Sequence, residues 1–154
     1  MTDLTILTES RVNHSRTVSY LMGVLAPIVN IDSHEAALCG WLHDFAYCIT
    51  DNEHHAAVGG ELLKEQGYIH WTEIANHGSI KGLDTPLGVL LNIADMTVDS
   101  NGKIVGFDKR LNDVASRYGQ DSIQYSECKN VIDAIMQTTI YDKLKSTIQE
   151  LITH

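Results

Sequence analysis

Apolar residues recur every three or four positions along nearly the whole chain of 154 residues, which is the spacing of amphipathic helices. No segment shows the sustained alternation of apolar and polar residues that is typical of strands, and there are only two prolines. No internal repeat or low-complexity linker divides the chain, and its length suffices to bury one core. The sequence therefore predicts an all-α protein with one compact helical domain over residues 1–154.

The expected helices cover the approximate ranges 12–29, 54–66, 71–77, 107–118 and 122–152, the last as one helix or as two with a bend. Thr85-Pro86 opens a further helix, because proline is favoured at the first turn. Ser33 is the expected N-cap of a helix that carries His43 and Asp44, and Pro27 bends or ends the helix before it. Gly67 suits the left-handed residue with which a helix commonly ends.

His43 and Asp44 are embedded in an otherwise apolar run over residues 36–46. A helix that is apolar all round is normally buried, and a buried carboxylate is costly without a strong partner. At 100° per residue the pair would lie on the same face as Ala36, Ala37 and Gly40. The opposite face would carry the larger apolar side chains, those of Leu38, Trp41, Leu42 and Phe45. Small neighbours let other helices approach closely, so the pair would lie at the floor of a site. A bound metal cation is one way to stabilise it there, and an ion pair or hydrogen-bonded aspartate within the core is the other.

Two further polar residues lie on apolar helix faces. His14 continues the stripe of Val18 and Leu21, and Asp95 comes late in the apolar segment after Pro86. Each alone fits an ordinary hydrogen-bonded residue. Together, His14, His43, Asp44 and Asp95 form a set that one divalent ion would satisfy. Mixed imidazole and carboxylate ligands suit Fe, Mn, Zn, Ni or Co.

His55 and His77 lie beside small residues, which leaves room for a ligand to approach. They are candidates for a second metal site or for binding a phosphate, whereas His54 is expected to face solvent. Negative charge on a phosphoryl group requires cations. The candidates for that role, each of which also fits an ordinary surface residue, are Arg16, Lys81, Lys103 and Arg110.

Composition narrows the possible partners. The chain has 11 basic and 20 acidic residues, a formal charge of −9, which argues against binding to nucleic acid polymers or to an anionic membrane surface. The 3 cysteines lack CxxC spacing, so buried thiols in a reducing compartment are expected. No run reaches the roughly 18 apolar residues of a membrane span, and the basic start of a signal peptide is missing. A cytoplasmic location is expected.

The order and spacing of these residues resemble the HD-domain superfamily of metal-dependent phosphohydrolases. The resemblance covers residues 11–97, with C-terminal helices following at about 106–152. It implies an all-α fold, and the family ligands map onto His14, His43, Asp44 and Asp95. In members with extra histidines, the residues matching His55 and His77 bind a second metal, bridged through the aspartate of the pair, or hold a substrate phosphate.

The nearest subgroup is that of the bacterial HD proteins that cleave dinucleoside polyphosphates, which residues 55–62 and 93–95 resemble. The chain departs from the pattern at Tyr47, where many HD proteins have lysine. It also lacks the Glu-Pro that often follows the Ala-Asp, since Met96-Thr97 stands there. These departures leave the ligand residues untouched.

The resemblance implies hydrolysis of a nucleotide or other small phosphorylated molecule by metal-activated water. One or two divalent transition ions would take part, with catalytic roles for Asp44, His55 and His77. The expected partner is that small substrate; no nucleic acid polymer or membrane is expected, and homo-oligomerisation is left open. Two alternatives remain: a di-iron oxygenase, which would show dioxygen-dependent turnover, and a nucleotide-binding sensor without turnover.

Overall fold

The computed structural model describes residues 7–51 and 53–153. Its α-helices are α1 (Glu9–Leu25), α2 (Ser33–Leu42), α3 (His55–Glu65), α4 (Trp71–Ala75), α5 (Pro86–Thr97), α6 (Phe107–Tyr118), α7 (Ile123–Ile135) and α8 (Thr139–Thr153). Short 3-10 helices connect them, namely η2 (Ala26–Val29), η3 (Phe45–Cys48) and η4 (Ile80–Leu83). Within the described part of the chain, the one extended pairing is an isolated bridge between Val98 and Ile104. The prediction of an all-α fold is confirmed.

Helix α5 is the centre of the bundle, and every residue from Leu87 to Thr97 is buried. It contacts α1, α2, α4, α6, α7 and α8. The Thr85 side chain caps its start by accepting a hydrogen bond from the Gly88 N–H, with Pro86 at the first helical position. Because α5 is surrounded, a polar residue late in this helix has to find its partners inside the protein.

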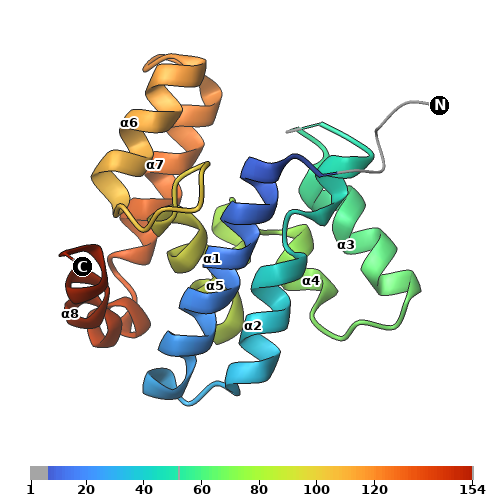
Figure 1. Ribbon diagram of the computed structural model, residues 1–154, viewed down its shortest axis with the longest axis horizontal. Coiled ribbons are helices and arrows are strands. Elements are labelled where there is room, and N and C mark those ends of the chain that lie inside the picture. Colours follow the sequence, from blue (N-terminus) through green and yellow to red (C-terminus); the bar gives the residue numbers. More distant parts are fainter. Residues whose placement is uncertain (1–6, 52, 154) are drawn as a thin grey trace.

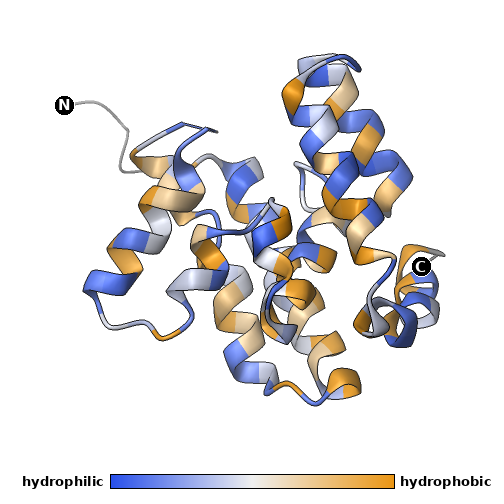
Figure 2. Cartoon of the chain, turned by 180° about the vertical axis from the view of Figure 1, so that it is seen from behind, coloured by the Kyte–Doolittle hydropathy of each residue, from blue (hydrophilic) through white to orange (hydrophobic). Residues whose placement is uncertain are grey.

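Three helix pairs are arranged around α5: α1 with α2, α3 with α4, and α6 with α7. The pair α6–α7 projects from one side, and α3 and α4 lie on the other side (Figure 1). Seen from behind, α6 and α7 alternate hydrophilic and hydrophobic residues along their length, as expected for helices that bury one face (Figure 2). No described helix is both long and apolar enough to cross a membrane.

Helix α2 ends earlier than the sequence predicts. Its last residue is Leu42, His43 is the C-cap, and Asp44 begins the turn into η3. The expectation that this apolar helix is buried all round is wrong, because the side chains of Leu38 and Trp41 are 46% and 45% exposed. The buried side instead carries small residues, Ala36, Cys39 and Gly40.

The reason is the close approach of α1. A Cβ on Gly40 would lie 2.9 Å from the Ser19 Cα of that helix, so large side chains do not fit between the two helices. The expectation that another helix packs closely against the small residues of α2 is therefore confirmed. This packing leaves the larger residues Leu38 and Trp41 exposed to solvent. Ser33 is also not the N-cap: Asp32 takes that position, and its side chain accepts the Glu35 N–H.

Most other expected boundaries match the structure. Pro27 lies in η2, directly after the end of α1, and Gly67 has the left-handed φ of 80°. The segment 122–152 forms two helices, α7 and α8, the second of its two expected arrangements. Cys39 and Cys128 are buried free thiols as expected, whereas Cys48 is half-buried.

Candidate metal centre

Four polar residues from three parts of the chain meet inside the protein. His14 comes from α1, His43 and Asp44 follow α2, and Asp95 comes from α5. All four are buried, and one ligand atom of each lies within 4.8 Å of the others. The His14 Nε2 is 2.8 Å from the Asp95 Oδ1. The His43 Nε2 lies 3.2 Å from the Asp44 Oδ2 and 3.3 Å from the Asp95 Oδ1.

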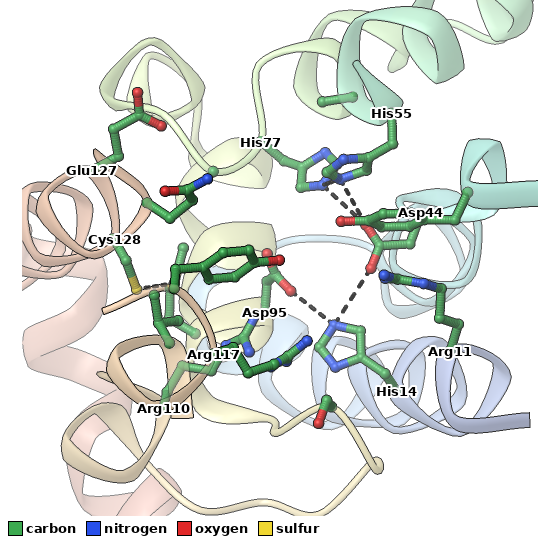
Figure 3. A pocket seen from close by; sticks show the side chains of 18 of the residues that line it. Arg11, His14, Asp44, His55, His77, Asp95, Arg110, Arg117, Glu127 and Cys128 are labelled. Carbon is green, nitrogen blue, oxygen red and sulfur yellow. Dashed lines mark hydrogen bonds and ion pairs between the residues drawn. The ribbon is translucent and has the colours of Figure 1, made fainter. Parts of the chain in front are cut away.

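A second set shares Asp44. The Asp44 Oδ1 lies 3.1 Å from the Nε2 of His55 and 3.2 Å from the Nε2 of His77. Those two Nε2 atoms are 3.0 Å apart. His55 begins α3, and His77 follows α4, which packs against α3. One carboxylate thus faces two ligand sets, His14 and His43 with one oxygen, His55 and His77 with the other. Figure 3 shows Asp44 between His14 and the pair of His55 and His77.

Backbone carbonyls orient the imidazoles of His14, His43 and His77. The Nδ1 of His14 lies 2.9 Å from the Asp99 carbonyl oxygen. The Nδ1 of His43 is 2.7 Å from that of Gly40, and the Nδ1 of His77 is 2.6 Å from that of Ile74. A carbonyl only accepts, so each Nδ1 donates and each Nε2 can present its lone pair to the centre. This arrangement is usual for histidines that bind metals.

The donor set fits a cation. The His43 Nε2 is fully buried and, among the described residues, makes no hydrogen bond of acceptable geometry, although two carboxylate oxygens lie nearby. Imidazole nitrogens and carboxylate oxygens that converge in a buried place are the ligands of divalent transition metals. His14, His43, Asp44 and Asp95 would hold one ion, and Asp44, His55 and His77 a second.

The electrostatics of the cluster are dominated by opposite charges in close contact. Burial opposes the charge on His43, but Asp44 and Asp95 outweigh it and raise the His43 pKa well above its usual value. Burial likewise opposes ionisation of Asp44, yet His43 and the close imidazoles of His55 and His77 hold its pKa well below the usual value. The pKa of Asp95 is lowered in the same way, against burial, by His14 and His43. Both carboxylates are therefore ionised at neutral pH, as metal ligands must be.

A cavity of about 490 Å³ opens over both ligand sets. His14, Asp44, His55, His77 and Asp95 line its floor. Its walls carry three arginines: Arg11 from α1, and Arg110 and Arg117 from α6. Arg11 approaches from one side of the ligands and the other two approach from the opposite side (Figure 3). The same walls also carry Glu53 and Glu127, so cationic and anionic groups both face this cavity.

The sequence indicated four basic residues as candidates for binding a phosphoryl group, and the structure places one of them at the cavity. Arg110 lines the cavity, but Arg16, Lys81 and Lys103 are exposed and do not. The Arg16 guanidinium donates to the Asn13 Oδ1 instead, and Lys81 lines a separate small pocket beside η4. The segment after α5 packs against α1 through the Thr17 hydroxyl, which donates to the Gly102 carbonyl. Lys103 belongs to this segment, and its side chain is exposed outside the cavity lining.

Sequence reasoning missed Arg11, Arg117 and Tyr47. Arg11 precedes His14 by three positions, so it lies on the same side of α1, and this spacing could have indicated it. Arg117 follows Arg110 by seven positions, two helical turns, which is the same kind of signal. For Tyr47 the sequence offered only its position three residues after Asp44.

Comparison with known proteins now defines the class. The HD domain family model matches residues 11–134, and the chain belongs to the HD domain family. Membership implies metal-dependent phosphohydrolase chemistry, and HD domains bind divalent metals. The substrate and the reaction type are matters for the proposal below.

Among curated proteins, the chain is similar to ribonuclease Y of Chlorobium phaeovibrioides (strain DSM 265 / 1930), with 27% identity over an alignment of 172 residues. The alignment covers 94% of this chain but 33% of the relative, so the chain spans about a third of the length of the curated relative that it matches. This similarity does not support the narrower resemblance to dinucleoside polyphosphate-cleaving proteins. No solved structure matches the chain significantly.

Proposed function

We propose that this protein hydrolyses a phosphate ester or anhydride bond in a small molecule, with a nucleotide as the favoured substrate. One observation carries the proposal: the Asp44 carboxylate faces two separate sets of histidines with its two oxygens, at the floor of a cavity. Such a carboxylate is suited to bridge two ions, and pairs of ions can stabilise both the attacking and leaving oxygens of a phosphoryl transfer.

The protein side chains have distinct tasks in this reaction. His14, His43, Asp44 and Asp95 would hold one divalent ion, and His55 and His77, with Asp44, a second. When bound, such an ion supplies Lewis-acid polarisation of a phosphoryl oxygen and makes a water molecule more acidic. Alternatively, with one ion bound, His55 and His77 would orient the phosphoryl group from the cavity floor, and the Asp44 carboxylate would accept a proton from the attacking water.

The arginines supply the positive charge that phosphoryl transfer requires. Arg110 and Arg117 both contact the same oxygen of Asp113, at 3.4 and 2.9 Å. Two guanidinium groups thus share the single negative charge of Asp113, which leaves one positive charge on the pair of arginines that lines the cavity. The Arg110 Nε is buried without a hydrogen-bond partner among the described residues, so this guanidinium is not fully satisfied by the protein.

The size of the cavity favours a small substrate. Its volume of about 490 Å³ falls in the range of roughly 300–1,000 Å³ that is typical of small-molecule sites. The curated relative is named as a ribonuclease, which makes a short RNA a reasonable member of any substrate panel. Dinucleoside polyphosphates belong in the panel because residues 55–62 and 93–95 resemble the proteins that cleave them.

The decisive experiment joins metal analysis to a substrate screen. Purified protein is analysed for bound metal and assayed with nucleoside mono-, di- and triphosphates, dinucleoside polyphosphates, a phosphodiester and a short RNA. We expect bound transition metal and chelator-sensitive phosphate-ester or anhydride cleavage. Asp44→Ala should lose both, whereas Asp51→Ala, which alters an exposed aspartate paired with His54, should keep both.

Three outcomes would overturn the proposal. Equal metal content in wild type and Asp44→Ala would show that the cluster does not bind the metal. Nucleotide binding by metal-loaded protein without any cleavage would identify a sensor. Dioxygen-dependent turnover in place of hydrolysis would identify an oxygenase.

A further inference from the structure

Three side chains from three elements form a continuous stack at the cavity wall. The Arg11 Cζ lies 3.2 Å from the centroid of the Tyr47 ring. The other face of the Tyr47 ring packs against the His55 imidazole, at a centroid distance of 4.1 Å and an interplanar angle of 17°. Arg11 belongs to α1, Tyr47 to η3 and His55 to α3. All three line the cavity.

We propose that Tyr47 is a positioning residue, which holds Arg11 as a binding group for a substrate phosphoryl oxygen and fixes the ring plane of His55. This inference rests on the proposed phosphohydrolase function and deepens it. It assigns to Arg11 the anion contact nearest the His55–His77 ligand set.

The geometry of the stack explains why Arg11 is available for an anion. A guanidinium that lies over an aromatic ring uses its face for that contact, while its N–H donors point outward in the guanidinium plane. Among residues 7–51 and 53–153, no ion pair joins Arg11 to a carboxylate. The Arg11 side chain also hydrogen-bonds to the Tyr47 hydroxyl. Its remaining in-plane donors can form the contact with phosphate that suits arginine.

The same stack acts on His55. The Tyr47 ring packs nearly parallel to the His55 ring, at a centroid distance of 4.1 Å and an interplanar angle of 17°, and this contact restricts rotation of the imidazole. The His55 Nε2 lies 3.1 Å from the Asp44 Oδ1. A rotation of this ring would move Nε2 away from that oxygen, so the aromatic contact keeps the ligand atom in place.

Binding of orthophosphate to the metal-loaded protein, measured by calorimetry, tests the inference without turnover. Arg11→Gln should weaken phosphate binding by about 10-fold or more, the usual scale for loss of a charge-assisted contact, and should leave metal content unchanged. Tyr47→Leu should weaken phosphate binding similarly and also lower the affinity for the second ion. Tyr47→Phe keeps both ring faces and loses only the hydroxyl beside Arg11, so its defects should be much smaller than those of Tyr47→Leu.

Lys64→Gln is the matched control, because it removes another cation from an aromatic ring, Trp71, outside the cavity lining. It should change neither phosphate nor metal binding. Unchanged phosphate affinity in Arg11→Gln, or equal defects in Tyr47→Phe and Tyr47→Leu, would overturn the inference. If the stack variants behave as expected and no phosphorylated compound is cleaved, the proposed reaction fails while the anion site stands.

Discussion

The imidazole of His14 donates from Nδ1 to the backbone carbonyl of Asp99, a residue 85 positions later, at 2.9 Å. Asp99 lies just after α5, which presents Asp95 to the Nε2 of the same ring at 2.8 Å. A five-residue stretch thus supplies both a candidate ligand and the group that orients its neighbour. Because a metal-binding imidazole needs its second nitrogen fixed, the turn after α5 is part of the site.

Asp95→Asn should weaken metal binding, because a neutral amide is a poorer ligand for a divalent cation than a carboxylate. At a metal concentration 100 times the Kd, a bound ion adds about 2.7 kcal/mol to the free energy of unfolding, and the variant should show only a small part of this gain. In the metal-free protein the substitution also removes the cost of burying a charge. Urea unfolding with and without chelator separates the two effects.

The exposed substitution Asp133→Asn on α7 is the control and should keep the full metal-dependent gain. If Asp95→Asn keeps it too, Asp95 has a structural role only.

His55→Ala and His77→Ala should each leave the first ion bound but reduce phosphohydrolase activity by about 10²-fold or more, the scale of losing a positioned acid, base or transition-state donor. His55→Ala should change stability little. His77→Ala also loses the bond to the Ile74 carbonyl, at a cost of about 1 kcal/mol. Steady-state kinetics, metal analysis and urea unfolding measure these effects.

His54→Ala is the neighbouring control, since the His54 side chain is 58% exposed, as the sequence predicts. Full turnover in both cavity variants, together with a loss of several kcal/mol in stability, would make His55 and His77 core histidines and leave one metal site.

Gly60→Ala should destabilise the protein by about 1–3 kcal/mol, the usual cost of overpacking. A Cβ at this position would overlap the Cβ of Ala75 and lie 2.8 Å from its Cα, forcing α3 and α4 apart. Since these helices position His55 and His77, affinity for the second ion should fall as well. Urea unfolding and metal titration are the measurements.

Gly23→Ala is the matched substitution in α1. Its Cβ would meet the Ala37 Cβ at an ordinary 3.6 Å, so the better helix propensity of alanine should make it neutral or stabilising by up to about 1 kcal/mol. Equal stability of both variants would show that the α3–α4 contact adapts to the extra methyl group.

Alkylation of the native protein at pH 8 should modify Cys48 and spare Cys39 and Cys128, as peptide mapping by mass spectrometry can show. Burial raises the pKa of Cys39 from 9.0 to about 12 and that of Cys128 to about 11, so the reactive thiolate is scarce at both. Modification of native Cys39 as fast as Cys48 would contradict this.

The raised pKa also has a consequence for stability. Below pH 9.0 the Cys39 thiol is protonated in both the folded and the unfolded state, so its contribution is fully present. As pH rises from 9.0 through about 12, the unfolded state gives up the proton first, and stability is lost. The unfolding free energy should therefore fall less steeply over this range in Cys39→Ala than in wild type.

Local signals in the sequence determined most helix boundaries. Thr85 and Pro86 start α5, and Gly67 follows the end of α3 with positive φ, because caps and turns depend on the few residues that form them. The apolar setting of His14, His43 and Asp95 likewise predicted inward polar residues, since helical spacing fixes which side of a helix a residue occupies.

Tertiary structure decided what those residues meet. Helix α2 stops at Leu42 and leaves Leu38 and Trp41 exposed, a result of helix packing that periodicity within α2 does not contain. The cavity walls join Arg11 near the start of the chain to Arg110 and Arg117 on α6. Which cations surround the ligands depends on the packing of helices about 100 positions apart, and only the folded chain brings those distant positions together.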